Sequence, residues 1–201
     1  MKVLVAFEES QEICIEFRKL GHEAYSCDIQ PCSGGHSEWH IQKDVFEIIG
    51  GGWDLVIAHP PCTRLTVTAN KWYKPEFRNR FPTILQDREI AVKFFMNIVN
   101  CGIPKICIEN PVGIMSTRYR KPDQYIQPYQ FGHFESKKTG LWLFGLTKLL
   151  PTDIVEPNYI ICKGKKYSPT HYNHIGGVKH GGKIRSKTYH GIAVAMAEQW
   201  G

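Results

Sequence analysis

The chain has 201 residues, of which 42% are hydrophobic and 22% charged, and its formal net charge is +6; these values favour one ordinary globular domain over a disordered or fibrous protein. No run approaches the roughly 18 apolar residues of a membrane span, and the N-terminal apolar run ends at Glu8, too early for a signal peptide. The seven cysteines lack regular spacing, so we expect reduced thiols in a cytoplasmic protein that does not contact a membrane.

The first two-thirds of the chain alternates strand-like and helix-like segments. Short apolar runs that read as buried strands are 3–7, 23–29, 53–58 and 105–110, with a shorter apolar piece at 45–49. Helices are predicted at 10–21 and 84–100, and Ile84, Ile90, Phe94 and Ile98 keep one side of the second helix apolar. This alternation predicts an α/β fold: a mainly parallel, twisted sheet flanked by helices.

The C-terminal third is less regular. Strands are predicted at 140–146 and 159–162, a long basic loop or small appended element at 163–187, and a closing helix at 188–200. We therefore expect a single domain over residues 1–201.

Positive charge is concentrated in two places. No acidic residue lies between Glu156 and Glu198, where the cations are Lys163, Lys165, Lys166, Lys179, Lys183, Arg185 and Lys187. Residues 64–80 interleave lysine and arginine with Trp72, Tyr73 and Phe77. Cations beside aromatic rings suit phosphates and unstacked bases, and a solvated loop is the alternative.

Parallel sheets bind ligands outside the carboxyl ends of their strands. The predicted strands place Glu8, Asp28, Cys62 and Glu109 at that edge.

Cys62 follows two prolines, which fix two φ angles and give the chain a rigid exit from the strand. Glu109 leaves the next strand and is also close to a proline. A thiol and a carboxyl at one sheet edge provide a nucleophile and an acid. Taken singly, the cysteine could fill the core and the glutamate could be a solvated strand end.

Four segments carry a family resemblance. HPPC at 59–62 is similar to a PPC nucleophile motif and ENP at 109–111 to an ENV motif, while 131–146 looks like the segment written YGxPQxRxRxFxxG and 191–200 like GNxVxxxVAxxI. The chain thus resembles the DNA cytosine-5 methyltransferases, in a short phage or prophage form without a large target-recognition domain.

The resemblance implies a Rossmann-like methyltransferase fold, S-adenosylmethionine as cofactor, and DNA with a flipped or single-stranded cytosine as partner. Cys62 would add to carbon 6 of the ring, and Glu109 would bind ring nitrogen 3 and the exocyclic amine. The implied cofactor contacts are Phe7, Glu8, Asp28, Asp44 and Pro60. The implied substrate contacts are Arg64, Lys71, Lys137, Lys138 and Asn110.

The chain departs from the family pattern in three places. The glycine-rich FxGxG loop is replaced by residues 7–11, which contain no glycine, so we expect a closed or reshaped methionine pocket. Glu135, Lys137 and Thr139 replace Gln, Arg and Arg of the QxRxR segment. A small basic insertion at about 147–187 stands in place of the target-recognition domain.

Three other functions stay open on the sequence. Pyrimidine modification on a free nucleotide or on RNA keeps the same chemistry, and the short recognition region favours it. A catalytically silent nucleic-acid-binding relative is favoured by the missing glycines. Zinc is also considered, at Cys27, Cys32, His36 and His40 or at Cys162, His171, His174 and His180, but the histidine-rich composition makes accidental clusters easy and we expect no metal.

Overall fold

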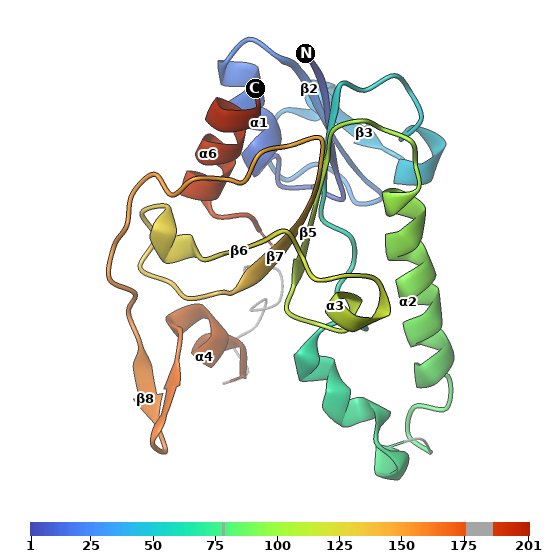
Figure 1. Ribbon diagram of the computed structural model, residues 1–201, viewed down its shortest axis with the longest axis vertical. Coiled ribbons are helices and arrows are strands. Elements are labelled where there is room, and N and C mark those ends of the chain that lie inside the picture. Colours follow the sequence, from blue (N-terminus) through green and yellow to red (C-terminus); the bar gives the residue numbers. More distant parts are fainter. Residues whose placement is uncertain (78, 176–186) are drawn as a thin grey trace.

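The structure is a computed structural model that describes residues 1–77, 79–175 and 187–201. Its centre is a seven-stranded sheet in the order β3-β2-β1-β4-β5-β7-β6 (Figure 1). The strands are β1 (Lys2–Ala6), β2 (Glu23–Asp28), β3 (His40–Gln42), β4 (Leu55–Ala58), β5 (Ile106–Pro111), β6 (Gln124–Ile126) and β7 (Thr139–Phe144). The first five are mutually parallel, and β7 runs antiparallel to both β5 and β6.

Helices lie on both faces of this sheet (Figure 1). The α-helices are α1 (Glu12–Lys19), α2 (Ile84–Val99), α3 (Met115–Arg118), α4 (Pro169–Ile175) and α6 (His190–Trp200). Short 3-10 turns are η1 (Ser37–Trp39), η2 (Val45–Glu47), η3 (Val67–Tyr73), η4 (Pro75–Phe77) and η5 (Pro128–Gln130). This arrangement confirms the predicted α/β fold with a mainly parallel sheet flanked by helices.

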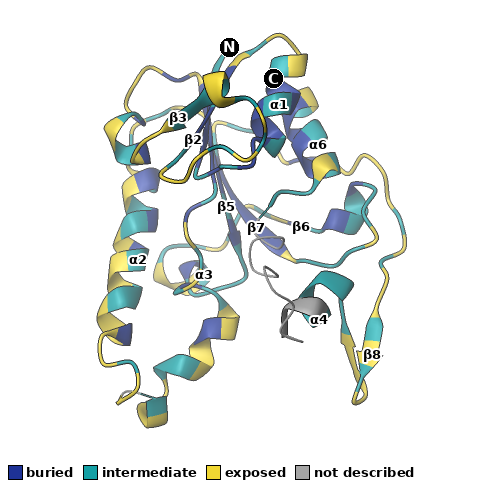
Figure 2. Ribbon diagram, turned by 180° about the vertical axis from the view of Figure 1, so that it is seen from behind, coloured by how far each residue is buried: buried dark blue, intermediate teal, exposed yellow. Residues whose placement is uncertain are grey.

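Two hydrophobic cores fill the space between the sheet and the helices, and the buried strands run through both (Figure 2). Val3 and Val5 pack with α1 and α6 on one face, whereas Leu4 and Ala6 pack with α2 on the other. Side chains alternate along a strand, and with both faces covered the parallel strands become continuous apolar runs. That is why the sequence signal for these strands is strong.

The buried face of α2 differs from the prediction. Ile90 is 57% exposed, while Val92 and Phe95 are buried with Ile84 and Ile98. Ile84, Val92, Phe95 and Ile98 share one helix face, and Ile90, two residues before Val92, points away from it. The predicted membership of Ile90 in the apolar face was wrong.

Two C-terminal strands form a separate hairpin. β8 (Ile160–Cys162) pairs antiparallel with β9 (Lys165–Tyr167), apart from the main sheet. In both views the hairpin stands away from the body of the protein (Figures 1 and 2). Of the predicted basic loop, β9 and α4 are described, while Lys179, Lys183 and Arg185 lie outside the described residues.

In the described ranges, no helix combines the length and apolarity needed to span a bilayer. All seven cysteines lie in these ranges, and none is in a disulfide.

Candidate active site

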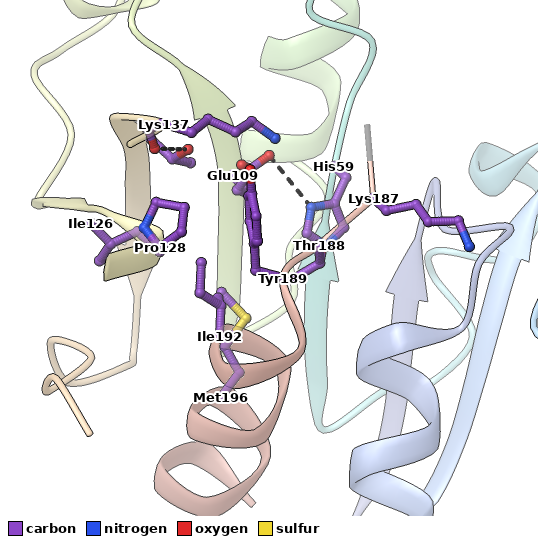
Figure 3. A pocket seen from close by; sticks show the side chains of 11 residues that line it. His59, Glu109, Ile126, Pro128, Lys137, Lys187, Thr188, Tyr189, Ile192 and Met196 are labelled. Atoms are coloured by element: carbon purple, nitrogen blue, oxygen red, sulfur yellow. Dashed lines mark hydrogen bonds and ion pairs between the residues drawn. The ribbon is translucent and has the colours of Figure 1, made fainter. Parts of the chain in front are cut away.

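The parallel register of β4 and β5 sets His59 beside Glu109. Ala58 pairs with Ile108, so the next residue of each strand lies at the same level on the carboxyl edge. Both side chains point to the face covered by α6, because the residues two positions earlier belong to the core on that face. Nδ1 of His59 lies 3.5 Å from Oε2 of Glu109 (Figure 3).

Glu109 is held as a carboxylate. Burial alone would raise its pKa, but a hydrogen bond with His59, the positive charge of Lys137 and a hydrogen bond from Thr139 outweigh it, and the pKa lies below its usual value. The charge of Lys137, one of the expected substrate contacts, therefore acts on Glu109. Lys138 is exposed and lies over the ring of Tyr125, with Nζ 4.4 Å from the ring centre.

A small cavity opens between this cluster and the start of α6 (Figure 3). His59, Glu109, Lys137 and Thr139 line it from the sheet side, and the segment 187–189 with Ile192 and Met196 lines the opposite side. The free volume is about 20 Å³, room for roughly one water molecule. A pyrimidine ring is larger, so side chains of this lining must move outward for a base to enter.

The PPC loop is fastened to the ENP loop, which consists of the end of β5 and residues 112–114. Asn110 is buried, and its Nδ2 donates to the Pro60 carbonyl at 3.1 Å. Two residues expected at cofactor and substrate thus form a contact between the loops. An antiparallel bridge joins Thr66 to Gly113, where an added Cβ would lie 2.1 Å from the Leu65 carbonyl oxygen.

Cys62 lies at the start of the fastened segment. Its carbonyl accepts the N–H groups of Leu65 and Thr66 at 2.9 and 3.1 Å, and the residue is half-buried. Cys62 does not belong to the lining of the cavity at Glu109. The structure therefore joins the two motif loops but does not show the thiol and the carboxyl in one pocket.

Residues 64–77 and Phe81 form a small aromatic unit beside the start of α2. Trp72 contacts the rings of Phe77 and Phe81 at 5.1 and 5.5 Å between ring centres. Arg64, an expected substrate contact, pairs with Asp87 at 2.9 Å. Lys71, another, is exposed, with Nζ 4.5 Å from the Trp72 ring centre.

The side chain of Glu8 binds the N-terminal end of α1. Its carboxylate accepts the N–H groups of Ile13 and Cys14 at 2.9 and 3.3 Å, and the residue is 5% exposed. Burial raises the pKa of Glu8 to about 7, against the lowering effects of the His59 charge and the two backbone hydrogen bonds. In this conformation the carboxylate of Glu8 is bonded to the backbone of α1.

The other expected cofactor residues lie along the same edge. Asp28 ends β2 and accepts the N–H of Gln30, and Asp44 caps η2 by accepting the N–H of Phe46. Phe7, with a left-handed φ of 63°, lies 5.3 Å from the ring of Phe94.

The residues at this edge suit the adenosine part of S-adenosylmethionine but not its methionine part. Two acids and an aromatic ring at the ends of β1, β2 and β3 suit an adenosine group. The methionine side is filled, because segment 33–36 packs on residues 9–11: Gln11 exchanges hydrogen bonds with the backbone of His36, and a Cβ on Gly34 would lie 2.5 Å from the Ser10 carbonyl oxygen. The amino-acid end of the cofactor does not fit this conformation.

The four residues of the first candidate zinc cluster make other contacts within the protein. Cys27 donates to the Lys43 carbonyl and Cys32 to Gln11, His36 stacks on Trp39, and His40 bonds Ser26. Among residues 1–77, 79–175 and 187–201, no three or more potential ligands group to hold a metal. Of the second cluster, His180 lies outside the described residues.

Sequence reasoning missed His59 and Thr139 as parts of the site. His59 was quoted within HPPC without a role. The alternation of β4 carries it to the same face as Ile57, but its meeting with Glu109 also needs β4 and β5 to be neighbours in a particular register. Thr139 comes from antiparallel β7, a still longer-range pairing.

Comparison of the chain with known proteins finds distant structural similarity. No protein-family model matches it, and no curated protein is significantly similar. Among 43 matching chains of solved structures, one is a crystal structure from E. coli described as a DNA modification methyltransferase encoded within a prophage, with 15% identity and a TM-score of 0.48. The match covers 77% of this chain and 51% of that one, so this chain spans about half its length. Likeness at this level carries no argument about activity.

Proposed function

We propose that the chain is an S-adenosylmethionine-dependent methyltransferase that acts on carbon 5 of cytosine in DNA. The observation that supports this most directly is the ionised Glu109, held with His59, Lys137 and Thr139 in a cavity at the carboxyl edge of the sheet. The loop that carries Cys62 is tied to the Glu109 loop through Asn110.

In this proposal, the Cys62 thiolate adds to carbon 6 of the ring, which breaks aromaticity and makes carbon 5 nucleophilic. Glu109 binds nitrogen 3 and the exocyclic amine, where charge develops. Lys137 keeps Glu109 oriented and ionised before the base arrives. S-Adenosylmethionine, when bound, supplies an electrophilic methyl group, and Phe7, Asp28 and Asp44 would hold its adenosine part.

The β8–β9 hairpin is the proposed contact to nucleic acid, in place of a target-recognition domain. Its tip turns through Lys163 and Gly164, both at positive φ, and exposes Lys163, Lys165 and Lys166. No acidic residue follows before Glu198. The major groove admits a two-stranded ribbon, and lysines that meet phosphates release counterions.

DNA binding tests the hairpin. Replacing the three lysines by alanine should weaken binding of a DNA duplex, measured by fluorescence anisotropy, and reduce the slope of log affinity against log salt by about 3. Lys105→Ala, at the opposite end of β5, is the matched control. An unchanged slope in the triple variant would remove the hairpin from the interface.

A silent nucleic-acid-binding relative is the second candidate, because Glu8 and segment 33–36 fill the methionine side of the cofactor edge. Calorimetric titration with S-adenosylmethionine and with its demethylated product separates the two. Heat that is lost in Asp28→Ala and kept in Asp54→Ala supports the enzyme. No heat with either compound supports the silent relative.

The chemical product tests the reaction itself. DNA incubated with the protein and the cofactor should contain 5-methylcytosine by mass spectrometry, and Cys62→Ala should leave none. Parallel incubations with RNA and with free cytidine nucleotides distinguish the substrate classes.

A further inference from the structure

His59 lies between two carboxyl groups. Its Nδ1 is 3.5 Å from Glu109 on β5, and its charge also acts on Glu8, in the turn between β1 and α1. Its Nε2 is buried and, within the part of the chain that the structure describes, has no hydrogen-bond partner. One nitrogen of the ring thus meets Glu109 while the other is kept from water.

Other titratable side chains lie on the elements around this imidazole. Lys137 approaches from the segment before β7 and the ring of Tyr189 from the segment before α6, whereas Lys187 points away and its Nζ lies 3.9 Å from Glu12 (Figure 3). Two carboxyls and the ammonium group of Lys137 are therefore the charged groups around His59 among the described residues.

The proposed chemistry requires a proton that Glu109 alone does not hold. When a thiolate adds to carbon 6, electron density moves through carbon 4 to nitrogen 3, and nitrogen 3 must be protonated. A carboxylate accepts hydrogen bonds and has no proton to give. Of the groups in contact with Glu109, an imidazole is the one that gains and loses a proton readily near neutral pH.

We propose that His59 is the proton source for Glu109 when the base is attacked. Sulfur of Cys62 bonds to carbon 6 and the π electrons shift to nitrogen 3. A proton then passes from Nδ1 of the His59 imidazolium through Glu109 to nitrogen 3, which leaves His59 as neutral imidazole. When the sulfur leaves, the proton returns by the same route, so nothing is consumed. His59 acts through Glu109 as a positioning residue, and this inference rests on the proposed function.

Exchange of the carbon-5 hydrogen tests the step without any cofactor. Once carbon 6 carries the sulfur, carbon 5 can take a deuteron from heavy water and later lose a proton. The probe is a cytosine-containing single-stranded oligodeoxynucleotide, with exchange followed by NMR. Wild type should exchange and Cys62→Ala should not.

The decisive variant is His59→Asn, which keeps a polar side chain and removes the titration. Exchange should slow by about 100-fold or more, and the fall in wild-type rate at alkaline pH should disappear from its profile. His22→Asn, a histidine outside the site, should behave as wild type. If His59→Asn exchanges within about threefold of wild type with the same alkaline fall, the inference is overturned while the proposed function stands.

If wild type does not exchange, the proposed function fails and the inference fails with it. If His59→Asn does not fold, the wild-type profile still decides. The midpoint of its alkaline fall must equal the midpoint of His59 titration measured on ¹⁵N-histidine-labelled protein with the oligonucleotide bound. A mismatch overturns the inference.

Discussion

Replacing Glu8 by glutamine should stabilise the protein at alkaline pH and leave it little changed at acid pH. Glu8 is 5% exposed, and burial raises its pKa from the usual 4.5 to about 7. Below 4.5 the carboxyl is protonated in both the folded and the unfolded chain. Between 4.5 and 7 the unfolded chain releases the proton while the folded chain keeps it, so the free energy of unfolding falls as pH rises.

The magnitude follows from the two pKa values. At about 1.4 kcal/mol for a tenfold change in equilibrium, the interval from 4.5 to about 7 corresponds to about 3 kcal/mol lost by pH 8. Glutamine resembles the protonated acid and still accepts from the backbone of α1. The stability difference between Glu8→Gln and wild type should therefore grow by about 3 kcal/mol from pH 4.5 to pH 8.

Urea unfolding followed by tryptophan fluorescence at several pH values measures this difference. Glu12→Gln, in the first turn of α1 and half-buried, is the control, and its offset from wild type should vary less with pH than that of Glu8→Gln. A Glu8→Gln offset that varies by less than about 1 kcal/mol across this range would show that Glu8 is not a buried acid.

Three further substitutions test the packing that positions the site. Gly113→Ala places a Cβ 2.1 Å from the Leu65 carbonyl oxygen, so it should open the bridge between the loops and cost about 2–4 kcal/mol in urea unfolding. Asn110→Ala leaves the Pro60 carbonyl without its donor and should cost about 1–3 kcal/mol, with faster amide hydrogen exchange in both loops. Ile90→Gln, on the exposed face of α2, should change the free energy of unfolding by less than about 0.5 kcal/mol. A loss of about 2 kcal/mol or more would show that Ile90 is packed in the core.

The strands that could be predicted from sequence are those buried on both faces. β1, β4 and β5 appear as apolar runs because helices cover both of their sides. β3, His40–Gln42, is a short edge strand with no buried residue, so it carries no apolar signal. β6 has three residues, and only Ile126 is buried.

The residues of the site also differ in how far local sequence predicts them. Cys62 and Glu109 could be proposed from motif spacing, since a resemblance needs only local sequence. The partners of Glu109 depend on which strands are neighbours and in which register, and these pairings join residues far apart in the chain. The exchange of hydrogen bonds between Gln11 and His36 is of the same kind: the missing glycines predicted a reshaped pocket, but not which segment fills it.

The pKa values of two carboxyls at one sheet edge are shifted in opposite directions, because the two carboxyls have different partners. Glu8 is bonded to backbone N–H groups inside the core, and these do not offset its burial. Glu109 is hydrogen-bonded to His59, is also affected by the charge of Lys137 and receives a hydrogen bond from Thr139, and together these partners outweigh burial. Where two titratable groups in one site have pKa values pushed apart, acid and base roles can be divided between them. The hydrogen bond with His59, the charge of Lys137 and the hydrogen bond from Thr139 therefore favour the ionised form of Glu109 in the cavity, while burial favours the protonated form of Glu8.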